Sequence, residues 1–303
     1  MHGGVRMSVA SVMQASQGLN ASVEALAALG AALRIRSEGM RVDPDVASLL
    51  DRVIEAIQPG GIEDLTADQA AIVLAFVRAF FRQALDLLEN PARAPGWSFE
   101  DPVILQAQGQ ASRSIAQTFC AYAEKDPDFA AALSRPARLL DVGTGVGWLA
   151  IECARLWPTM QVLGIDIFEP ALVMARGNVA AADIGARVAF RNQDIADLDE
   201  VEAFDLSWFS GPFIAADKVP ESLRQIARAT KPGGWLVFGT YNPPPSELGR
   251  LLTGLRIVRS GGRPWSEAEA ADLIEAAGFE SRGSFTTGSP VLVVVGRKAG
   301  KPQ

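Results

Sequence analysis

The chain has 303 residues, of which 28 are basic, 35 are acidic and 49% are hydrophobic, and its formal net charge is −7. This length and apolar content exclude a disordered chain, and the acidic balance argues against a protein that binds nucleic acid by neutralising phosphates. The single histidine, His2, argues against a histidine-based triad, a histidine metal cluster or a histidine general base.

The cysteines and apolar runs indicate where the protein resides. Cys120 and Cys153 are too few for a disulfide framework, and we interpret them as small buried side chains in a reducing compartment. The first residues lack the apolar core of a signal peptide. The longest apolar run, 70–81, is interrupted by Arg78 and is too short to cross a bilayer. We therefore expect a cytoplasmic protein that does not enter the membrane.

The first 130 residues have helical patterning without a convincing strand. Helices are expected over 22–33, 44–57, 66–88 and 102–124. The stretch 66–89 is apolar over more than a single stripe, so we expect part of it to form a dimer interface. Residues 1–130 carry 10 basic and 16 acidic groups, whereas residues 131–303 carry 18 and 19. Pattern and charge therefore both predict two domains, 1–130 and 131–303, the first of them all-α.

Strands and helices alternate in the second domain. The strands are expected over 138–142, 161–167, 187–191, 204–209 and 235–240, and the helices over 146–157, 169–182, 217–229 and 265–277. Two last strands, 279–287 and 290–296, are separated only by Gly288-Ser289, which is the spacing of a tight hairpin. This order predicts an α/β fold with a mostly parallel sheet and one antiparallel strand at its edge.

A glycine-rich turn joins the first strand to the next helix. Its sequence is Asp141-Val142-Gly143-Thr144-Gly145-Val146-Gly147-Trp148. Glycines let the backbone approach a ligand closely, and the helix start behind them offers free amides. A nicotinamide fingerprint places its third glycine three positions after the second, whereas Gly147 follows Gly145 by two. The spacing disfavours a dinucleotide oxidoreductase.

Several motifs in order make residues 135–297 resemble a class I S-adenosylmethionine-dependent methyltransferase domain. The turn resembles the family's first motif, and Asp166, 25 residues after Asp141, resembles its ribose-binding acid. Gln193-Asp194-Ile195 follows the third strand, where the family binds adenine. The segments 209–213 and 231–236 resemble the motifs around the family's fourth and fifth strands. The resemblance implies a Rossmann-like, seven-stranded methyltransferase sheet with a terminal antiparallel hairpin, preceded by an all-α N-terminal domain.

The resemblance also implies S-adenosylmethionine as the cofactor and assigns residues to it. Asp141 would accept hydrogen bonds from the ammonium group, and Asp166 would accept both ribose hydroxyls. Asp194 would accept the adenine amino group, the Ile195 amide would donate to the ring, and Ile167 would lie on the adenine face. The other cofactor-binding residues implied are Gly143, Thr144, Gly145, Gly147 and Phe209.

The acceptor side is less defined by motifs. Many family members with an N-terminal helical domain use a histidine base, which this chain does not offer. The remaining catalytic candidates are Tyr241, after the fifth strand, and the acids near it. Aromatic walls suit an apolar or planar acceptor. The candidate substrate residues are Trp97, Phe99, Ser210 and Phe213, and no metal site is expected. The arginines at 250, 256, 259 and 263 either hold an acidic group of the acceptor or form a solvated helix face.

These features predict an enzyme that transfers a methyl group from S-adenosylmethionine to an O, N or C atom of a small, moderately apolar acceptor. The enzyme would act mainly by positioning and desolvation, without a histidine base. One alternative is a methyltransferase-fold protein with other chemistry, such as aminopropyl transfer or cyclisation. Another is a non-catalytic cofactor-binding protein. We expect no nucleic-acid or membrane partner, and a homodimer formed through the N-terminal helices.

Overall fold

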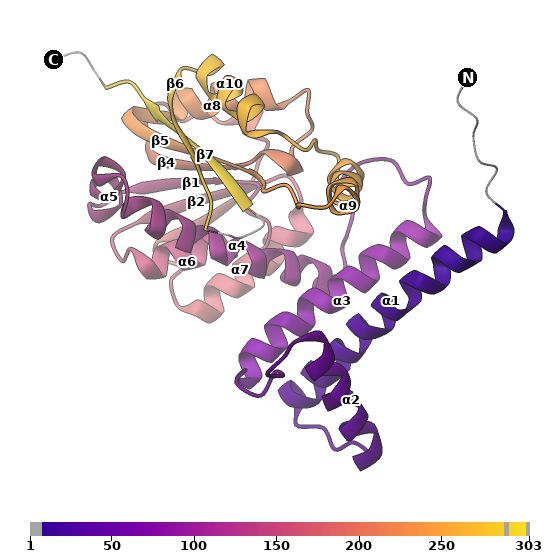
Figure 1. The fold of residues 1–303 in the computed structure, drawn as a ribbon. Coiled ribbons are helices and arrows are strands. Elements are labelled where there is room, and N and C mark those ends of the chain that lie inside the picture. Colours follow the sequence, from indigo (N-terminus) through magenta and orange to yellow (C-terminus); the bar gives the residue numbers. More distant parts are fainter. Residues whose placement is uncertain (1–7, 288–290, 301–303) are drawn as a thin grey trace, which may run out of the picture. The chain divides into compact units, whose positions relative to one another are not determined.

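The computed structural model describes residues 8–287 and 291–300, and its internal contacts divide the chain into two compact units (Figure 1). The first unit is Met1–Glu89 and the second is Asn90–Gln303. The unit boundary therefore differs from the one predicted near residue 130. Helices α4 (Pro102–Ala123) and α5 (Pro127–Ser134) belong to the second unit because their apolar side chains are buried in the same cluster as the sheet.

The first unit consists of three helices, α1 (Val9–Glu38), α2 (Pro44–Ile57) and α3 (Ala67–Glu89). Its buried core is small and comprises Leu33, Ala70, Leu74 and Val77. Much apolar surface stays exposed on α1 and α3, at Val12, Met13, Leu19, Val23, Ile72, Val73, Phe80, Leu85 and Leu88. Among the described residues, α1 has the length and composition that could cross a membrane, which a helix of a soluble protein can also have.

The second unit carries the sheet. Its strands are β1 (Arg138–Val142), β2 (Gln161–Asp166), β3 (Val188–Asn192), β4 (Phe204–Ser210), β5 (Thr230–Tyr241), β6 (Phe279–Phe285) and β7 (Val291–Lys298). Its further helices are α6 (Trp148–Leu156), α7 (Glu169–Ala182), η1 (Ile195–Asp197), η2 (Gly211–Phe213), α8 (Val219–Ala229), α9 (Glu247–Arg259) and α10 (Glu267–Ala276). Helices α5 and α9 and the N-terminal part of α1 have no counterpart among the predicted elements.

The strand order is β3-β2-β1-β4-β5-β7-β6, with β7 antiparallel to both of its neighbours. The seven-stranded sheet is the one that the resemblance implies. The antiparallel strand, however, lies between β5 and β6 and not at the edge, since β7 pairs with β5 from Val291 to Arg297. The Gly288-Ser289 turn lies outside the described residues.

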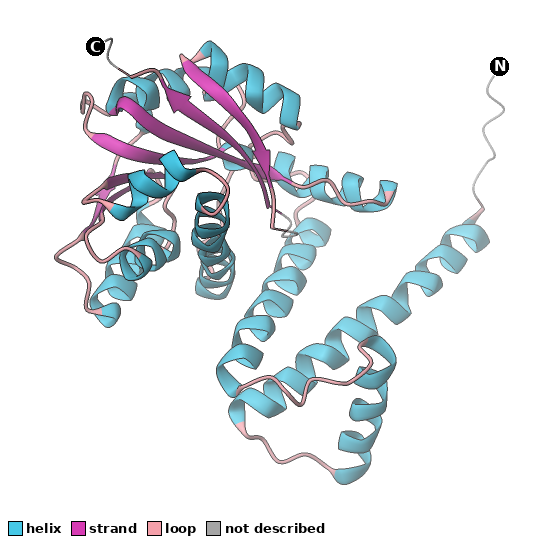
Figure 2. Ribbon diagram, turned by 60° about the vertical axis from the view of Figure 1, so that its left-hand side comes forward, coloured by secondary structure: helices cyan, strands magenta, loops and turns pink. Residues whose placement is uncertain are grey.

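Helices cover both faces of this sheet (Figure 2). Leu139 of β1 is buried in a cluster with side chains of α4, α5 and α6, whereas its neighbour Leu140 is buried with side chains of α8 and α10. The strand order reverses between β1 and β4, so the connections leave these two strands toward opposite sides. In open α/β sheets, ligands bind at the carboxyl ends of the strands beside such a switch point.

An ion-pair network fixes the opposite, amino-terminal edge of the sheet. The Asp205 carboxylate of β4 is 5% exposed and lies 2.7 Å from Lys231 Nζ and 3.2 Å from the Arg135 guanidinium. It also accepts a hydrogen bond from the Arg138 amide at 3.0 Å. Lys231, which belongs to the segment resembling a family motif, thus anchors the start of β5.

We predict that Asp205→Ala lowers the free energy of unfolding by about 1–3 kcal/mol, because the Arg138 amide and two cations lose their shared acceptor. Urea unfolding followed by circular dichroism measures this loss. The control is Glu221→Ala, which breaks the exposed pair with Arg224 and should change the free energy of unfolding much less than Asp205→Ala does. Equal effects of the two substitutions would contradict this account of the network.

Candidate active site

The glycine-rich turn leaves β1 at the carboxyl edge of the sheet and leads into α6. Gly143, Gly145 and Gly147 have φ angles of 73°, 56° and 80°, in the region that favours glycine. The amides of Gly143 and Thr144 donate to the Ile165 carbonyl at 2.9 and 3.1 Å, which fastens the turn to β2. Apart from the adjoining residues of the turn, no described heavy atom lies within 4 Å of where a Cβ would stand at Gly143 or Gly145. The turn is therefore bonded to β2 and adjoins open space.

Asp141 supplies a buried carboxylate beneath this turn. It is 1% exposed, and its Oδ2 accepts a hydrogen bond from Thr144 Oγ1 at 2.6 Å. Burial raises the pKa of the Asp141 carboxyl to about 7; the Thr144 hydrogen bond opposes this rise, and the charge of Asp166 adds to it. Thr144 is thus placed to orient Asp141, since its hydroxyl and amide are both bonded within the protein.

Asp166 ends the neighbouring strand β2. Its Oδ2 accepts from the Gly145 amide at 2.8 Å and its Oδ1 from the Phe168 amide at 2.9 Å. Burial raises the pKa of Asp166, and these backbone hydrogen bonds oppose the rise. The turn and the two acids are brought together as predicted. Two adjacent carboxylates with raised pKa values favour a ligand that carries positive charge and hydrogen-bond donors.

The residues predicted to hold adenine follow β2 and β3. Ile167 is 70% exposed and so offers an open apolar face. Asp194 caps η1 by accepting from the Ala196 amide at 3.0 Å, and its Oδ2 lies 3.5 Å from Lys218 Nζ. The Ile195 side chain is buried in the core, so only its backbone can serve a ligand.

The structure assigns Phe209 a different place from the predicted one. Its side chain is fully buried on the face of the sheet covered by α8 and α10, and its ring centroid lies 5.4 Å from that of Phe238. Phe209 is therefore a core residue whose ring cannot contact a cofactor. The adjacent Ser210 ends β4 and precedes η2, which carries Phe213.

Three of the four predicted acceptor residues and Tyr241 form a continuous row of rings, which we call the aromatic row. The ring centroids of Phe99 and Trp97 are 5.5 Å apart, those of Trp97 and Phe213 are 6.0 Å apart, and those of Phe213 and Tyr241 are 6.4 Å apart. Trp97 also packs against the buried cluster that includes Val146 of the glycine-rich turn. The row thus runs from the turn to the carboxyl end of β5.

Tyr241 is the last residue of β5, whereas the sequence predicted it directly after this strand. Burial raises the pKa of its hydroxyl, and the positive charge of Arg256 opposes this rise. The hydroxyl therefore stays protonated near neutral pH. Tyr241 is suited to donating a hydrogen bond and poorly suited to acting as a base.

Two supporting contacts were not predicted. Trp265 Nε1 donates to the Gly211 carbonyl at 3.3 Å, and a Cβ at Gly262 would lie 1.7 Å from the Pro212 carbonyl oxygen, so this segment backs η2 closely. On the other side, Gln106 of α4 accepts from Trp148 Nε1 at 2.7 Å. In the sequence, the Gly261-Gly262 pair and Trp148 could have drawn attention to these contacts. The sequence does not show which residues they contact.

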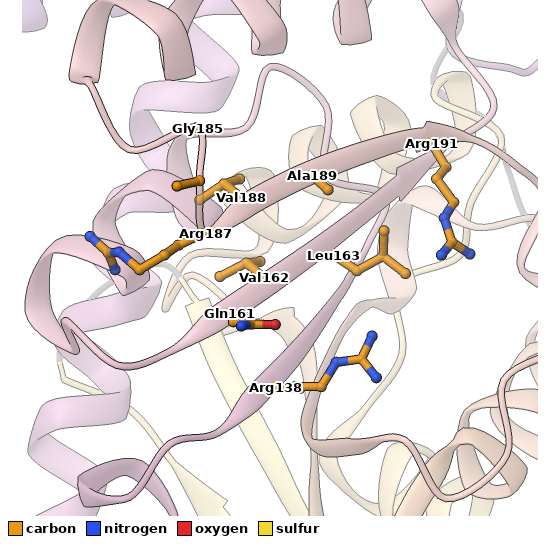
Figure 3. Close-up of a pocket in the computed structure, with 10 residues that line it drawn as sticks. Arg138, Gln161, Val162, Leu163, Gly185, Arg187, Val188, Ala189 and Arg191 are labelled. Atoms are coloured by element: carbon orange, nitrogen blue, oxygen red, sulfur yellow. The ribbon is translucent and has the colours of Figure 1, made fainter.

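A separate cavity of about 180 Å³ lies against β1, β2 and β3, lined in part by Arg138, Arg187 and Arg191 (Figure 3). Its arginines have internal partners: Arg191 pairs with Glu200 at 2.7 Å, Arg187 bonds the Ala154 carbonyl, and Arg138 stacks on Phe204. The cavity is lined mainly by the starts of the strands and lies apart from the glycine-rich turn. Among the described residues, no group of acidic, histidine or cysteine side chains could hold a metal ion.

The cofactor that the resemblance implies fits the residues present. S-adenosylmethionine carries a sulfonium charge and an ammonium group, which suit the two carboxylates, and ribose hydroxyls, which suit acceptor oxygens at Asp166. The open space beside Gly143 and Gly145 lets a ligand approach the backbone of the turn closely, which a side chain at either position would obstruct.

Comparisons with known proteins agree with this fit. The family described as "Methyltransferase domain" matches residues 139–234. The chain is 33% identical over 183 residues to the demethylmenaquinone methyltransferase of Thermus thermophilus, a match that covers 53% of this chain and 82% of that protein. It spans about half or less of the length of the first curated relatives it matches, at 42%, 53% and 42%.

Solved structures share the fold over nearly the whole chain. An O-methyltransferase family protein from Burkholderia thailandensis has a TM-score of 0.67 at 18% identity, with 98% of this chain and 99% of that chain covered. Human N-acetylserotonin methyltransferase, solved in complex with S-adenosylmethionine, has a TM-score of 0.66 at 16% identity, with the same coverage. The residues that match the family include the glycine-rich turn and Asp166. The demethylmenaquinone methyltransferase, of which the match covers 82%, is 33% identical to this chain. The chain therefore belongs to the class I S-adenosylmethionine-dependent methyltransferases.

Proposed function

We propose that this protein transfers the methyl group of S-adenosylmethionine to a small, moderately apolar acceptor with a flat ring. The observation that carries the proposal is the aromatic row, because it begins at the glycine-rich turn and ends at Tyr241. Edge-to-face contacts such as these leave ring surfaces available to a planar ligand. The fold neighbours are consistent with an oxygen acceptor, since one is described as an O-methyltransferase family protein.

The residues of the site divide the work of holding the two reactants. When bound, S-adenosylmethionine supplies an electrophilic methyl group. Asp141 accepts hydrogen bonds from its ammonium group, directly or through water, and Asp166 accepts the ribose hydroxyls. Ile167 and the backbone at Ile195 flank the adenine, with Asp194 as acceptor for its amino group. The aromatic row excludes water and fixes the acceptor's plane, and Tyr241 donates a hydrogen bond to it.

Two other functions use the same cofactor site. One is non-methylating chemistry on S-adenosylmethionine, such as aminopropyl transfer or cyclisation, and the other is cofactor binding without catalysis. An assay with methyl-labelled S-adenosylmethionine and a panel of phenols, amines and enols separates them. We expect label in an acceptor; a product without the label supports the first rival, and binding with no product across the panel supports the second.

We also propose that the protein is a cytoplasmic homodimer without a nucleic-acid partner, formed through α1 and α3. The support is the number of large apolar side chains that are exposed on these two helices, because single exposed apolar side chains are normal whereas many on one surface indicate an interface. The net charge of −7 disfavours a polyanionic partner. Light scattering in solution tests the dimer, and a monomeric mass at micromolar concentration would contradict it.

We predict that Asp166→Ala weakens binding of S-adenosylhomocysteine about 10- to 100-fold, because the ribose hydroxyls lose a charged acceptor. Isothermal titration calorimetry measures this affinity. The matched control is Asp199→Ala, which removes an exposed carboxylate elsewhere in the unit and should leave the affinity unchanged. Unaltered affinity of a folded Asp166→Ala protein would exclude the ribose assignment.

A further inference from the structure

One side-chain amide of α4 lies against the glycine-rich turn. Gln106 is partly buried and lies three residues before Gly109, on the same side of the helix. A Cβ at Gly109 would stand 2.1 Å from Val146 Cγ2 and 2.9 Å from Trp148 Cδ1, so the missing side chain lets α4 pack directly on the turn. The hydrogen bonds of a partly buried amide show which groups it holds in place.

The Gln106 amide is hydrogen-bonded at both of its ends. Its Oε1 accepts from Trp148 Nε1 at 2.7 Å, and its Nε2 donates to Asn178 Oδ1 of α7 at 3.1 Å. Asn178 Nδ2 in turn donates to the Val146 carbonyl at 2.9 Å, and it also lies 3.4 Å from Gln106 Oε1. Side chains of α4, α6 and α7 thus meet at one carbonyl of the turn.

The chemistry of the outer partners fixes the direction of these hydrogen bonds. An indole N–H can only donate, so Gln106 must turn its oxygen toward Trp148 and its nitrogen toward Asn178. A backbone carbonyl can only accept, so Asn178 must turn its nitrogen toward Val146. Each amide therefore has one orientation that satisfies its neighbours. Removing either amide leaves the others without partners, which makes the network specific.

The same peptide group of the turn leads on to Asp141. The Val146 carbonyl belongs to the peptide between Val146 and Gly147, and the Gly147 amide donates to the Thr144 carbonyl at 2.9 Å. Thr144 Oγ1 donates to Asp141 Oδ2 at 2.6 Å. Asn178 therefore holds one end of this peptide group and Thr144 holds the other. A continuous chain of hydrogen bonds runs from α4 through the turn to the buried carboxylate.

We propose that Gln106 and Asn178 are positioning residues that set the turn for the amino-acid end of S-adenosylmethionine. The inference rests on the proposed methyl transfer and adds two residues to its cofactor site. They act through the turn and not by contact with the cofactor. They fix the Val146 carbonyl and, through Thr144, the orientation of the Asp141 carboxylate, which accepts the ammonium group.

The proposal makes the two ends of the cofactor depend on different contacts. Asp141 and its chain of hydrogen bonds serve the ammonium end. Asp166 serves the ribose and is held by the Gly145 and Phe168 amides, which lie outside that chain. A general loosening of the fold would weaken every ligand of the site alike. Loss of the Gln106 amide should instead weaken a ligand that has the amino-acid end and spare one that lacks it.

A pair of ligands tests this difference without turnover. S-adenosylhomocysteine carries the amino-acid end, whereas 5′-deoxy-5′-methylthioadenosine has the same adenosine and sulfur without it. Isothermal titration calorimetry gives both affinities. We expect the native protein to bind S-adenosylhomocysteine at least about tenfold more tightly, because the smaller ligand lacks the charge-assisted hydrogen bond to Asp141.

Three variants assign this preference to the network. Gln106→Met and Asn178→Leu remove the hydrogen bonds at similar side-chain size. Each should weaken S-adenosylhomocysteine binding about tenfold and methylthioadenosine binding by less than about twofold. The double variant should lose little more than the larger single loss, because both residues act in one chain. The matched control is Gln110→Met, which removes an amide that bonds Arg113 on the same side of α4 and should change neither affinity.

Equal losses for the two ligands, or unchanged affinities in a folded variant, would overturn the positioning role. A loss of the same size in Gln110→Met would overturn it too. Circular dichroism checks folding, and Asn178→Leu carries the test if Gln106→Met does not fold. Failure of the native protein to bind S-adenosylhomocysteine would contradict the proposed methyl transfer. Native binding whose preference persists in the variants would overturn only the role of Gln106 and Asn178.

Discussion

The burial of two neighbouring carboxylates is the constraint on which the site depends. Asp141 is the second-last residue of β1 and Asp166 is the last residue of the neighbouring β2, and burial raises the pKa of both. Neither has an ion-pair partner within the part of the chain that the structure describes, although the sheet elsewhere pairs its buried Asp205 with Lys231 and Arg135. Such an arrangement lowers stability unless a cationic ligand compensates it, which is typical of a binding site and not of a structural core.

The rest of the second unit holds Asp141 and Asp166 in place and leaves open space beside the glycine-rich turn. The reversal of strand order at β1 and β4 brings the glycine-rich turn and η2 to one edge of the sheet. Hydrogen bonds from Thr144 and Gly145 orient the two acids, so a ligand meets a formed site. The aromatic row continues from the turn to Tyr241, which places a second, apolar reactant next to a charged one.

Sequence predicts that Asp141, the glycines and Asp166 lie together, because their positions depend on local spacing along a strand and turn. It also predicts that Phe213 and Tyr241 lie near each other, since Phe213 follows β4, Tyr241 ends β5 and these two strands pair. The buried Phe209 shows the limit: β4 is buried on both faces, so its pattern does not tell which rings face the site. Helical patterning likewise could not show that α4 packs on the sheet, and the hairpin pattern did not determine that β7 pairs with β5.

The most direct test of this account counts protons on cofactor binding. Calorimetric titrations of S-adenosylhomocysteine near pH 6.5, in buffers that differ in ionisation enthalpy, report how many protons leave the protein. A cationic group beside Asp141 lowers its pKa from about 7, so binding should release about half a proton or more, and affinity should rise with pH. Asp141→Asn should remove most of this release. A binding enthalpy in the native protein that is the same in every buffer would contradict the central role of the buried acids.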